Sequence, residues 1–221
     1  MIQRLAFDIS HLLAGGLVLV SLLLLYQVRM FALINAYAVH ACLLTLAVAW
    51  QALTQDAPHL YITAAITLGF KVTIIPLALR RIVRRLEVHR AIETVVGVGP
   101  TMLLGLALVA LSIVVVLPIT TGADVLAREE LAFAMSVVLL GLLMMVTRRN
   151  AVGQVIGFMS LENGLILAAA AAKGMPLVVE FSIAFSILIA FIVIGIFLFR
   201  IRERFDSVDV LVVDRFRGER T

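Results

Sequence analysis

The sequence has few charged residues and a single cysteine. Asp, Glu, Lys and Arg make up only 14% of its 221 residues, against roughly a quarter in an ordinary soluble domain. Cys42 lies inside an apolar run, so a disulfide framework and a cysteine-based zinc or iron–sulfur site are excluded. Walker, Rossmann, Ser-His-Asp and haem-binding motifs are also missing. We therefore expect neither a soluble catalytic domain nor a cofactor of its own.

Apolar residues dominate the chain instead. They make up 63% of the sequence, and the mean hydropathy is +1.14. At ~20 residues per bilayer crossing, this composition predicts an all-α, polytopic transmembrane helix bundle. Continuous apolar runs favour helices over barrel strands, which would alternate polar and apolar residues. The seven expected spans are residues 9–28, 31–54, 59–79, 94–119, 131–147, 151–172 and 177–199.

The basic residues alternate between the two sides of the expected bundle. One side holds Arg29, Arg80, Arg81, Arg84, Arg85, Arg90, Arg148, Arg149, Arg200, Arg202, Arg204, Arg215, Arg217 and Arg220, and the other only Arg4, Arg128 and Lys173. Because basic loops stay in the cytoplasm, the N-terminus is predicted outside and the C-terminus cytoplasmic. Membrane orientation and lipid contact thus account for the pI near 9.8, and we expect no nucleic-acid partner.

A parallel three-helix repeat is indicated by two matching pairs of residues. Arg29 and Arg149 each precede a helix with polar residues, and Pro58 and Pro176 each open the next helix. The predicted organisation is a first three-helix unit with a basic cytoplasmic connector (1–93), a connecting helix (94–119), a second three-helix unit (129–200) and a cytoplasmic tail (201–221).

Four ionisable residues lie inside the expected spans: His40, Lys71, Glu162 and Glu180. A charged side chain at the bilayer centre costs about 2.5 to 3.5 kcal/mol on insertion scales, so it usually faces protein or water and has a functional reason. Lys71 and Glu162 are the strongest candidates, since both are near mid-span. A lysine and a carboxyl in one dry network can exchange a proton, which is what a relay requires.

Each candidate also has a plainer interpretation. Lys71 could extend its stem toward an interface, and Glu162 could be a structural carboxyl bonded to a neighbouring helix. His40 could relay a proton near neutral pH or be a packing residue. Glu180, four residues after Pro176, could be solvated at the outer interface. Pro76 predicts a kink that leaves the Val72 carbonyl without its usual donor, close to Lys71.

Three stretches of the sequence are similar to known membrane subunits. Residues 147–170 read TRRNAVGQVIGFMSLENGLILAAA and resemble the K subunit of respiratory complex I and the C subunit of Mrp-type cation/proton antiporters. With NAYAVH at 35–40 and MPLVVEFSIAF at 175–185, most of the chain resembles hydrogenase-4 component E. The resemblance matches Glu162 to the second-helix glutamate of the K subunit. Glu180 matches the third-helix glutamate, at a closer spacing than the K subunit has.

The resemblance implies a non-catalytic membrane-arm subunit of a complex I-like hydrogenase or related redox-driven ion-translocating complex. Its partners would be antiporter-like and other membrane subunits, with a hydrogenase or similar redox module attached through the complex. The expected location is the plasma (inner) membrane of a bacterium or archaeon. Two alternatives stay open, a purely structural subunit and a subunit of a cation/proton antiporter complex. Proton and sodium both remain open as the coupled ion.

Overall fold

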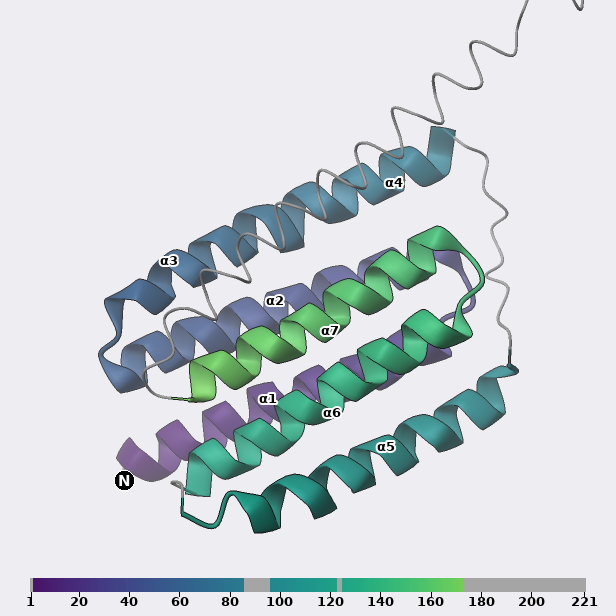
Figure 1. Cartoon of the computed structure of the whole chain (residues 1–221). Coiled ribbons are helices and arrows are strands. Elements are labelled where there is room, and N and C mark those ends of the chain that lie inside the picture. The colour runs from purple at the N-terminus through teal and green to yellow at the C-terminus, as the bar shows by residue number, and fades with distance from the viewer. Residues whose placement is uncertain (1, 86–95, 123–124, 173–221) are drawn as a thin grey trace, which may run out of the picture. The chain divides into compact units, whose positions relative to one another are not determined.

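The computed structural model describes residues 2–85, 96–122 and 125–172, and its regular elements in these ranges are all helical (Figure 1). They are α1 (Ile2–Tyr26), α2 (Met30–Gln55), α3 (Pro58–Thr67), the π-helical segment η1 (Leu68–Ile74), α4 (Ile75–Arg85), α5 (Val98–Ile119), α6 (Val125–Thr147) and α7 (Ala151–Ala171).

Six of the described helical segments are long and apolar enough to cross a membrane. α3, η1 and α4 join into one of these, Pro58–Arg84, and the other five each come from a single helix. The prediction of a helical membrane protein is therefore confirmed in the described residues. The seventh expected span, 177–199, lies outside them, so the count of seven and the parallel repeat stay predictions.

The described membrane-length segments alternate in direction along the chain, so that the contacting pairs α1 and α6, and α2 and α7, run parallel (Figure 1). α1, α2, α6 and α7 form the centre, because α1 contacts α2 and α6, and α7 contacts α2 and α6. The α3–η1–α4 span packs on α2, whereas α5 packs on α6 and α1. Helices far apart in sequence, α2 and α7, thus become direct neighbours.

Three glycines let α6 and α7 approach backbone to backbone. A Cβ added to Gly141 would lie 2.5 Å from the Leu161 backbone nitrogen, and one added to Gly164 would lie 2.8 Å from that of Val138. At Gly157 the same atom would lie 2.9 Å from the backbone nitrogen of Met145. Small residues at a helix interface permit this close packing in membranes, where the hydrophobic effect does not drive helices together.

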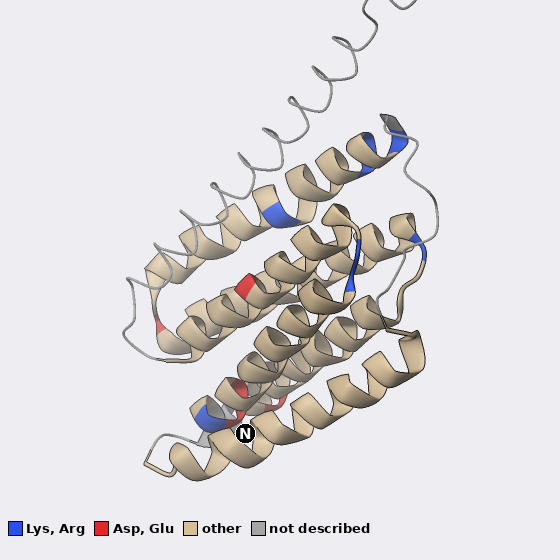
Figure 2. Ribbon diagram, turned by 45° about the vertical axis from the view of Figure 1, so that its right-hand side comes forward, with Lys and Arg blue, Asp and Glu red and all other residues tan. Residues whose placement is uncertain are grey.

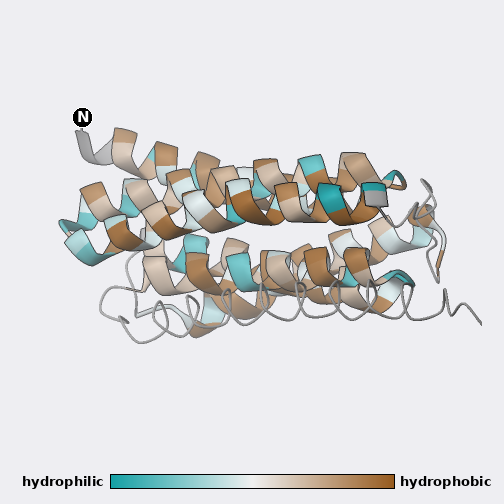
Figure 3. Ribbon diagram, turned by 90° about the horizontal axis from the view of Figure 1, so that it is seen from above, coloured by the Kyte–Doolittle hydropathy of each residue, from teal (hydrophilic) through white to brown (hydrophobic). Residues whose placement is uncertain are grey.

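Apolar residues occur along the whole length of these helices (Figure 3), and many large ones are exposed. Leu12, Leu19, Val114 and Val146 each have more than two thirds of their surface exposed. Exposed apolar surface on this scale marks a membrane or partner contact. Together with the six span-capable helices, it identifies an integral membrane protein.

Apart from Lys71 and Glu162, the charged residues gather at the ends of the helices (Figure 2). The end that holds the α1–α2 and α6–α7 connections and the last turns of α4 carries the described basic positions Arg29, Arg80, Arg81, Arg84, Arg85, Arg148 and Arg149. The opposite end carries Asp8, Asp56, Arg128, Glu129 and Glu130. The alternation in the sequence predicts a strongly basic end opposite one with few basic residues, whereas the acidic residues of that opposite end were not predicted.

Candidate functional site: a buried polar network between four membrane helices

The π-helical segment η1 positions Lys71. In this segment the backbone N–H of Ile75 donates to the carbonyl of Phe70, five residues earlier, in place of the four-residue step of an α-helix. The segment ends just before Pro76, whose ring nitrogen has no hydrogen to donate. The sequence predicts a kink there, and the structure has this wider turn in the preceding residues. Lys71 is the buried residue of the segment, and π-helical turns of this kind are frequent at functional sites.

Lys71 forms an ion pair with Glu162 of α7. Its Nζ lies 3.1 Å from Oε1 of Glu162, and the two residues are only 2% and 3% exposed. Glu162 lies near the middle of α7, so the pair is well inside the helices. Because little water reaches the two charges, burying them has a large desolvation cost. Their mutual attraction offsets this cost.

The network continues from Lys71 through an amide to His40. Lys71 Nζ donates to Asn163 Oδ1 over 2.9 Å, and Asn163 Nδ2 lies 2.9 Å from His40 Nδ1. On the other side of the ring, His40 Nε2 lies 2.9 Å from the Ser21 hydroxyl. We call Lys71, Glu162, Asn163, His40 and Ser21 the mid-bundle network. It joins α1, α2, η1 and α7, and all five side chains are buried.

Three of the four ionisable residues predicted from the sequence meet in this network, namely Lys71, Glu162 and His40. The fourth, Glu180, lies outside the described residues. Asn163 and Ser21 were not predicted. Asn163 has a weak signal, because it is an amide next to Glu162 in an apolar helix. Ser21 has none, since a serine in a membrane helix usually bonds its own backbone, as Ser21 also does with the carbonyl of Leu17 over 2.9 Å.

Two buried hydroxyls belong to the same helices as the network. Tyr37 precedes His40 by one turn on α2, and Ser160 precedes Glu162 by two residues on α7. Neither hydroxyl has a hydrogen-bond partner among the described residues, and both side chains are buried. Buried polar groups of this kind are usually satisfied by internal water.

A second buried polar group lies at the acidic end, and we call it the end cluster. The Gln51 amide of α2 donates to the Glu130 carboxyl of α6, and Gln55 donates to Gln51 Oε1. Gln55 also donates to the carbonyl of Ala170 on α7 over 2.8 Å. Glu130 is only 3% exposed. Glu130 was not predicted, because the expected span began at residue 131, one residue later.

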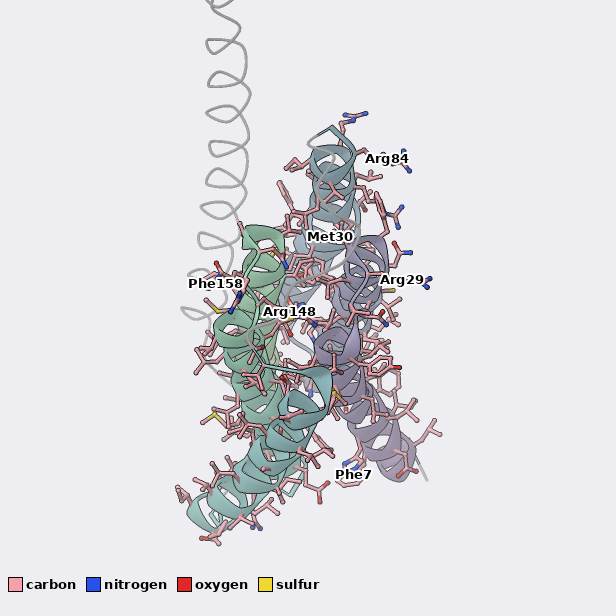
Figure 4. All side chains as sticks on the ribbon, turned by 90° about the vertical axis from the view of Figure 1, so that its right-hand side faces the viewer. Phe7, Arg29, Met30, Arg84, Arg148 and Phe158 are labelled. Atoms are coloured by element: carbon pink, nitrogen blue, oxygen red, sulfur yellow. The ribbon has the colours of Figure 1, made fainter. Side chains whose placement is uncertain are left out.

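The sequence predicts Arg148 to be one of the charged residues of a basic loop, but the structure buries it. Its side chain is 1% exposed, and Nη2 donates to the carbonyls of Leu24 and Leu25 over 3.0 and 2.8 Å. It therefore caps the last turn of α1 from the α6–α7 connection, whereas Arg29 and Arg84 lie at the surface of the same end (Figure 4). Burial lowers the pKa of Arg148, but a guanidinium stays protonated under ordinary conditions.

The mid-bundle network has the groups that proton exchange needs. A lysine and a glutamate in contact can exist as an ion pair or, after one proton moves from Nζ to the carboxylate, as a neutral amine and acid. The end cluster has one carboxyl, Glu130, which accepts a hydrogen bond from the Gln51 amide, a group that does not titrate. Of the two sites, the mid-bundle network is therefore the better candidate for proton transfer.

Comparisons with known proteins give distant relatives over most of the chain. Hydrogenase-4 component E of Escherichia coli is 28% identical over 207 residues, which are 92% of this chain and 95% of that protein. An uncharacterized protein of Mycobacterium tuberculosis is 27% identical over 199 residues, 89% of this chain and 90% of that protein. No protein-family model and no solved structure matches the chain. The chain is thus a membrane protein distantly related to hydrogenase-4 component E.

Proposed function

We propose that this chain is a membrane-arm subunit of a complex I-like hydrogenase, or of a related redox-driven ion-translocating complex. In that assembly it contributes a proton-relay segment and a scaffold. The distant similarity to hydrogenase-4 component E, along nearly the full length of both chains, supports the assignment to a hydrogenase-like complex. The six span-capable helices support a place in its membrane part.

The observation that carries the relay is the buried contact between Lys71 and Glu162. In the ion-paired state the proton is on Lys71 Nζ, 3.1 Å from the carboxylate oxygen. Transfer breaks one N–H bond and forms one O–H bond, which leaves a neutral amine and a carboxylic acid. Both states are neutral as a pair, and in the ion-paired state the attraction between the two charges offsets part of their desolvation cost. A charge change in a neighbouring subunit can then bias the pair.

Hydration supports movement of the proton beyond the pair. The buried hydroxyls of Tyr37 and Ser160 would bind internal water close to the network, and ordered water readily bridges polar groups. In this proposal His40 and Glu180 are further stations on the path. His40 is joined to Lys71 through Asn163, and Glu180 is assigned from the sequence and its resemblance.

The charge distribution supports an orientation and a location. The basic end of the helices would face the cytoplasm, and the N-terminus would then lie outside. The proposed membrane is the plasma membrane of a bacterium or archaeon. The unit at 129–200 would supply the Glu162 side of the relay and the unit at 1–93 the Lys71 side. The exposed apolar faces would contact lipid and antiporter-like subunits.

The test replaces Glu162 by Gln in the assembled complex. We expect the complex to assemble, because Gln keeps the size and an oxygen that accepts a hydrogen bond from Lys71. Redox-coupled proton movement into inverted vesicles should fall to a small fraction of wild type, because an amide does not take up the lysine proton. The readouts are the subunit composition of the purified complex and acidification of the vesicle lumen.

Two further variants make the result specific. Glu129→Gln removes a carboxyl that is about one third exposed and should leave proton movement unchanged. Glu162→Asp keeps a carboxyl and should restore a measurable part of it. Normal proton movement by an assembled Glu162→Gln complex would refute the relay.

A scaffold without a relay is the second candidate, and specific contacts favour it. The close α6–α7 packing and the Arg148 cap of α1 would hold a rigid body between larger subunits. This alternative predicts that deleting the chain disrupts the complex, while no single replacement of Lys71, Glu162 or His40 changes proton movement in complexes that assemble.

A further inference from the structure

Asn163 is the central residue of the mid-bundle network, and its side chain is completely buried. Its amide has a different atom on each side. Oδ1 accepts a hydrogen bond from the Lys71 ammonium, whereas Nδ2 faces Nδ1 of His40. An amide nitrogen only donates, so His40 Nδ1 must be the unprotonated, accepting nitrogen of the ring.

The other side of the ring leads to the same tautomer. The Ser21 hydroxyl donates its one hydrogen to the carbonyl of Leu17 over 2.9 Å. Its oxygen must then accept the 2.9 Å hydrogen bond from His40 Nε2. Every donor in this series therefore points the same way, from Lys71 through Asn163, His40 and Ser21 to the backbone of α1. In this arrangement Lys71 is cationic and His40 is neutral.

We propose that the Asn163 amide is a two-position switch that makes Lys71 and His40 mutually exclusive carriers of positive charge. An imidazolium donates from both nitrogens, so a charged His40 needs an acceptor where Nδ2 now lies. A half-turn of the amide supplies that acceptor with little change of shape. The same turn brings the amide hydrogens to Lys71, which then has to be a neutral amine that accepts. The inference rests on the proposed relay and adds a rule for it.

The two positions of the amide go with two protonation states of the network. In the first, Lys71 is an ammonium, Glu162 is a carboxylate and His40 is neutral. In the second, the Lys71 proton has moved to Glu162, and His40 has taken a proton from water at Nδ1. Lys71, Glu162, His40 and Tyr37 are the titratable groups that η1, α7 and α2 contribute here, and α1 contributes the Ser21 hydroxyl. The rule lets a proton enter at His40 only after the Lys71 proton has moved to Glu162.

The state of the His40 ring tests the proposal without any pumping assay. The full chain, purified in lipid nanodiscs with ¹⁵N-labelled histidine, has four histidines, and the His40→Gln variant identifies the His40 signals. In wild type we expect one neutral tautomer of His40 with its hydrogen on Nε2. It should stay unchanged between about pH 5 and pH 8, an interval that contains the ordinary pKa of histidine.

The decisive variant is Lys71→Met/Glu162→Gln, which removes both charges of the pair and leaves the local net charge unchanged. The Asn163 oxygen is then free to turn, so His40 should gain a proton on Nδ1 at a pH at least about one unit above that needed in wild type, a tenfold change in proton affinity. Adding Asn163→Leu should abolish the gain, because the acceptor is removed.

Three results would overturn the switch. One is a wild-type His40 that is already an imidazolium or carries its hydrogen on Nδ1. Another is a ring in the double variant that behaves as in wild type. The third is a gain of the His40 proton that persists after Asn163→Leu, because the gain would then come from removing the nearby charges and not from the amide. None of these results alters the Glu162→Gln test of the relay, so the two proposals can fail separately.

Discussion

Two carboxyl groups, Glu162 and Glu130, are buried in the part of the chain that the structure describes, and they have different partners. Both residues are 3% exposed. Glu162 lies near the middle of α7 and is paired with Lys71, whereas Glu130 lies in the second turn of α6 and accepts a hydrogen bond from the Gln51 amide. Far from water a carboxylate needs a cation to offset its desolvation. Near a helix end, neutral donors are sufficient. Of these two sites, the mid-bundle network is the one in which a proton has both a donor and an acceptor.

Breaking the ion pair from one side should have the largest effect on stability. We expect Lys71→Met to lower the free energy of unfolding by about 3 to 5 kcal/mol, because Glu162 keeps a buried charge without its partner. Unfolding of the purified chain in mixed micelles by added sodium dodecyl sulfate would measure it. Lys71→Met/Glu162→Leu should recover most of the loss. If the double variant is as unstable as the single one, the pair is not the cause.

Removing the donor to the other carboxyl should have an intermediate effect. We expect Gln51→Leu to cost about 1 to 3 kcal/mol, the usual penalty for a buried acceptor that loses its partner. The same unfolding assay applies. Gln55→Leu is the matched control, and it should cost less, because Gln55 is only half-buried and water can replace its bonds. Equal losses for both variants would argue against a specific role of the Gln51–Glu130 contact.

Neutralising Glu130 itself should have the smallest effect. Glu130→Gln keeps the shape and an acceptor for the Gln51 amide, so we expect a change in stability below about 1 kcal/mol, as for other replacements that preserve the hydrogen bond. Redox-coupled proton movement in the assembled complex should stay at the wild-type level, as for Glu129→Gln. A strong loss specific to Glu130→Gln would place the end cluster on the proton path and remove the contrast between the two carboxyls.

The elements themselves were largely predictable because the bilayer imposes a simple rule. Each apolar run must be long enough to cross the hydrocarbon and must satisfy its own backbone, which selects helices. The expected span 31–54 is accordingly within one residue of α2 at both ends. The π-helical turn before Pro76 was not predicted, because a proline shows where an α-helix is disturbed but not how the backbone adapts.

The candidate site was predictable only in part. Lys71, Glu162 and His40 could be singled out because charge inside a membrane span is expensive and rarely accidental. Glu130 was missed for the opposite reason, since an acidic residue at the edge of an apolar run normally lies in water. Its burial depends on Gln51 of α2, 79 positions away in the sequence.

The sequence by itself determined that the chain resides in a membrane, which of the described segments are helical, and which side chains are too costly to face lipid. Hydrophobicity and helix length act locally, so they can be read along the chain. The tertiary structure decided that Lys71 meets Glu162 and that Asn163 stands between Lys71 and His40. Those contacts join η1, α2 and α7. They depend on which helices pack side by side, at distances that glycines such as Gly141 and Gly164 permit.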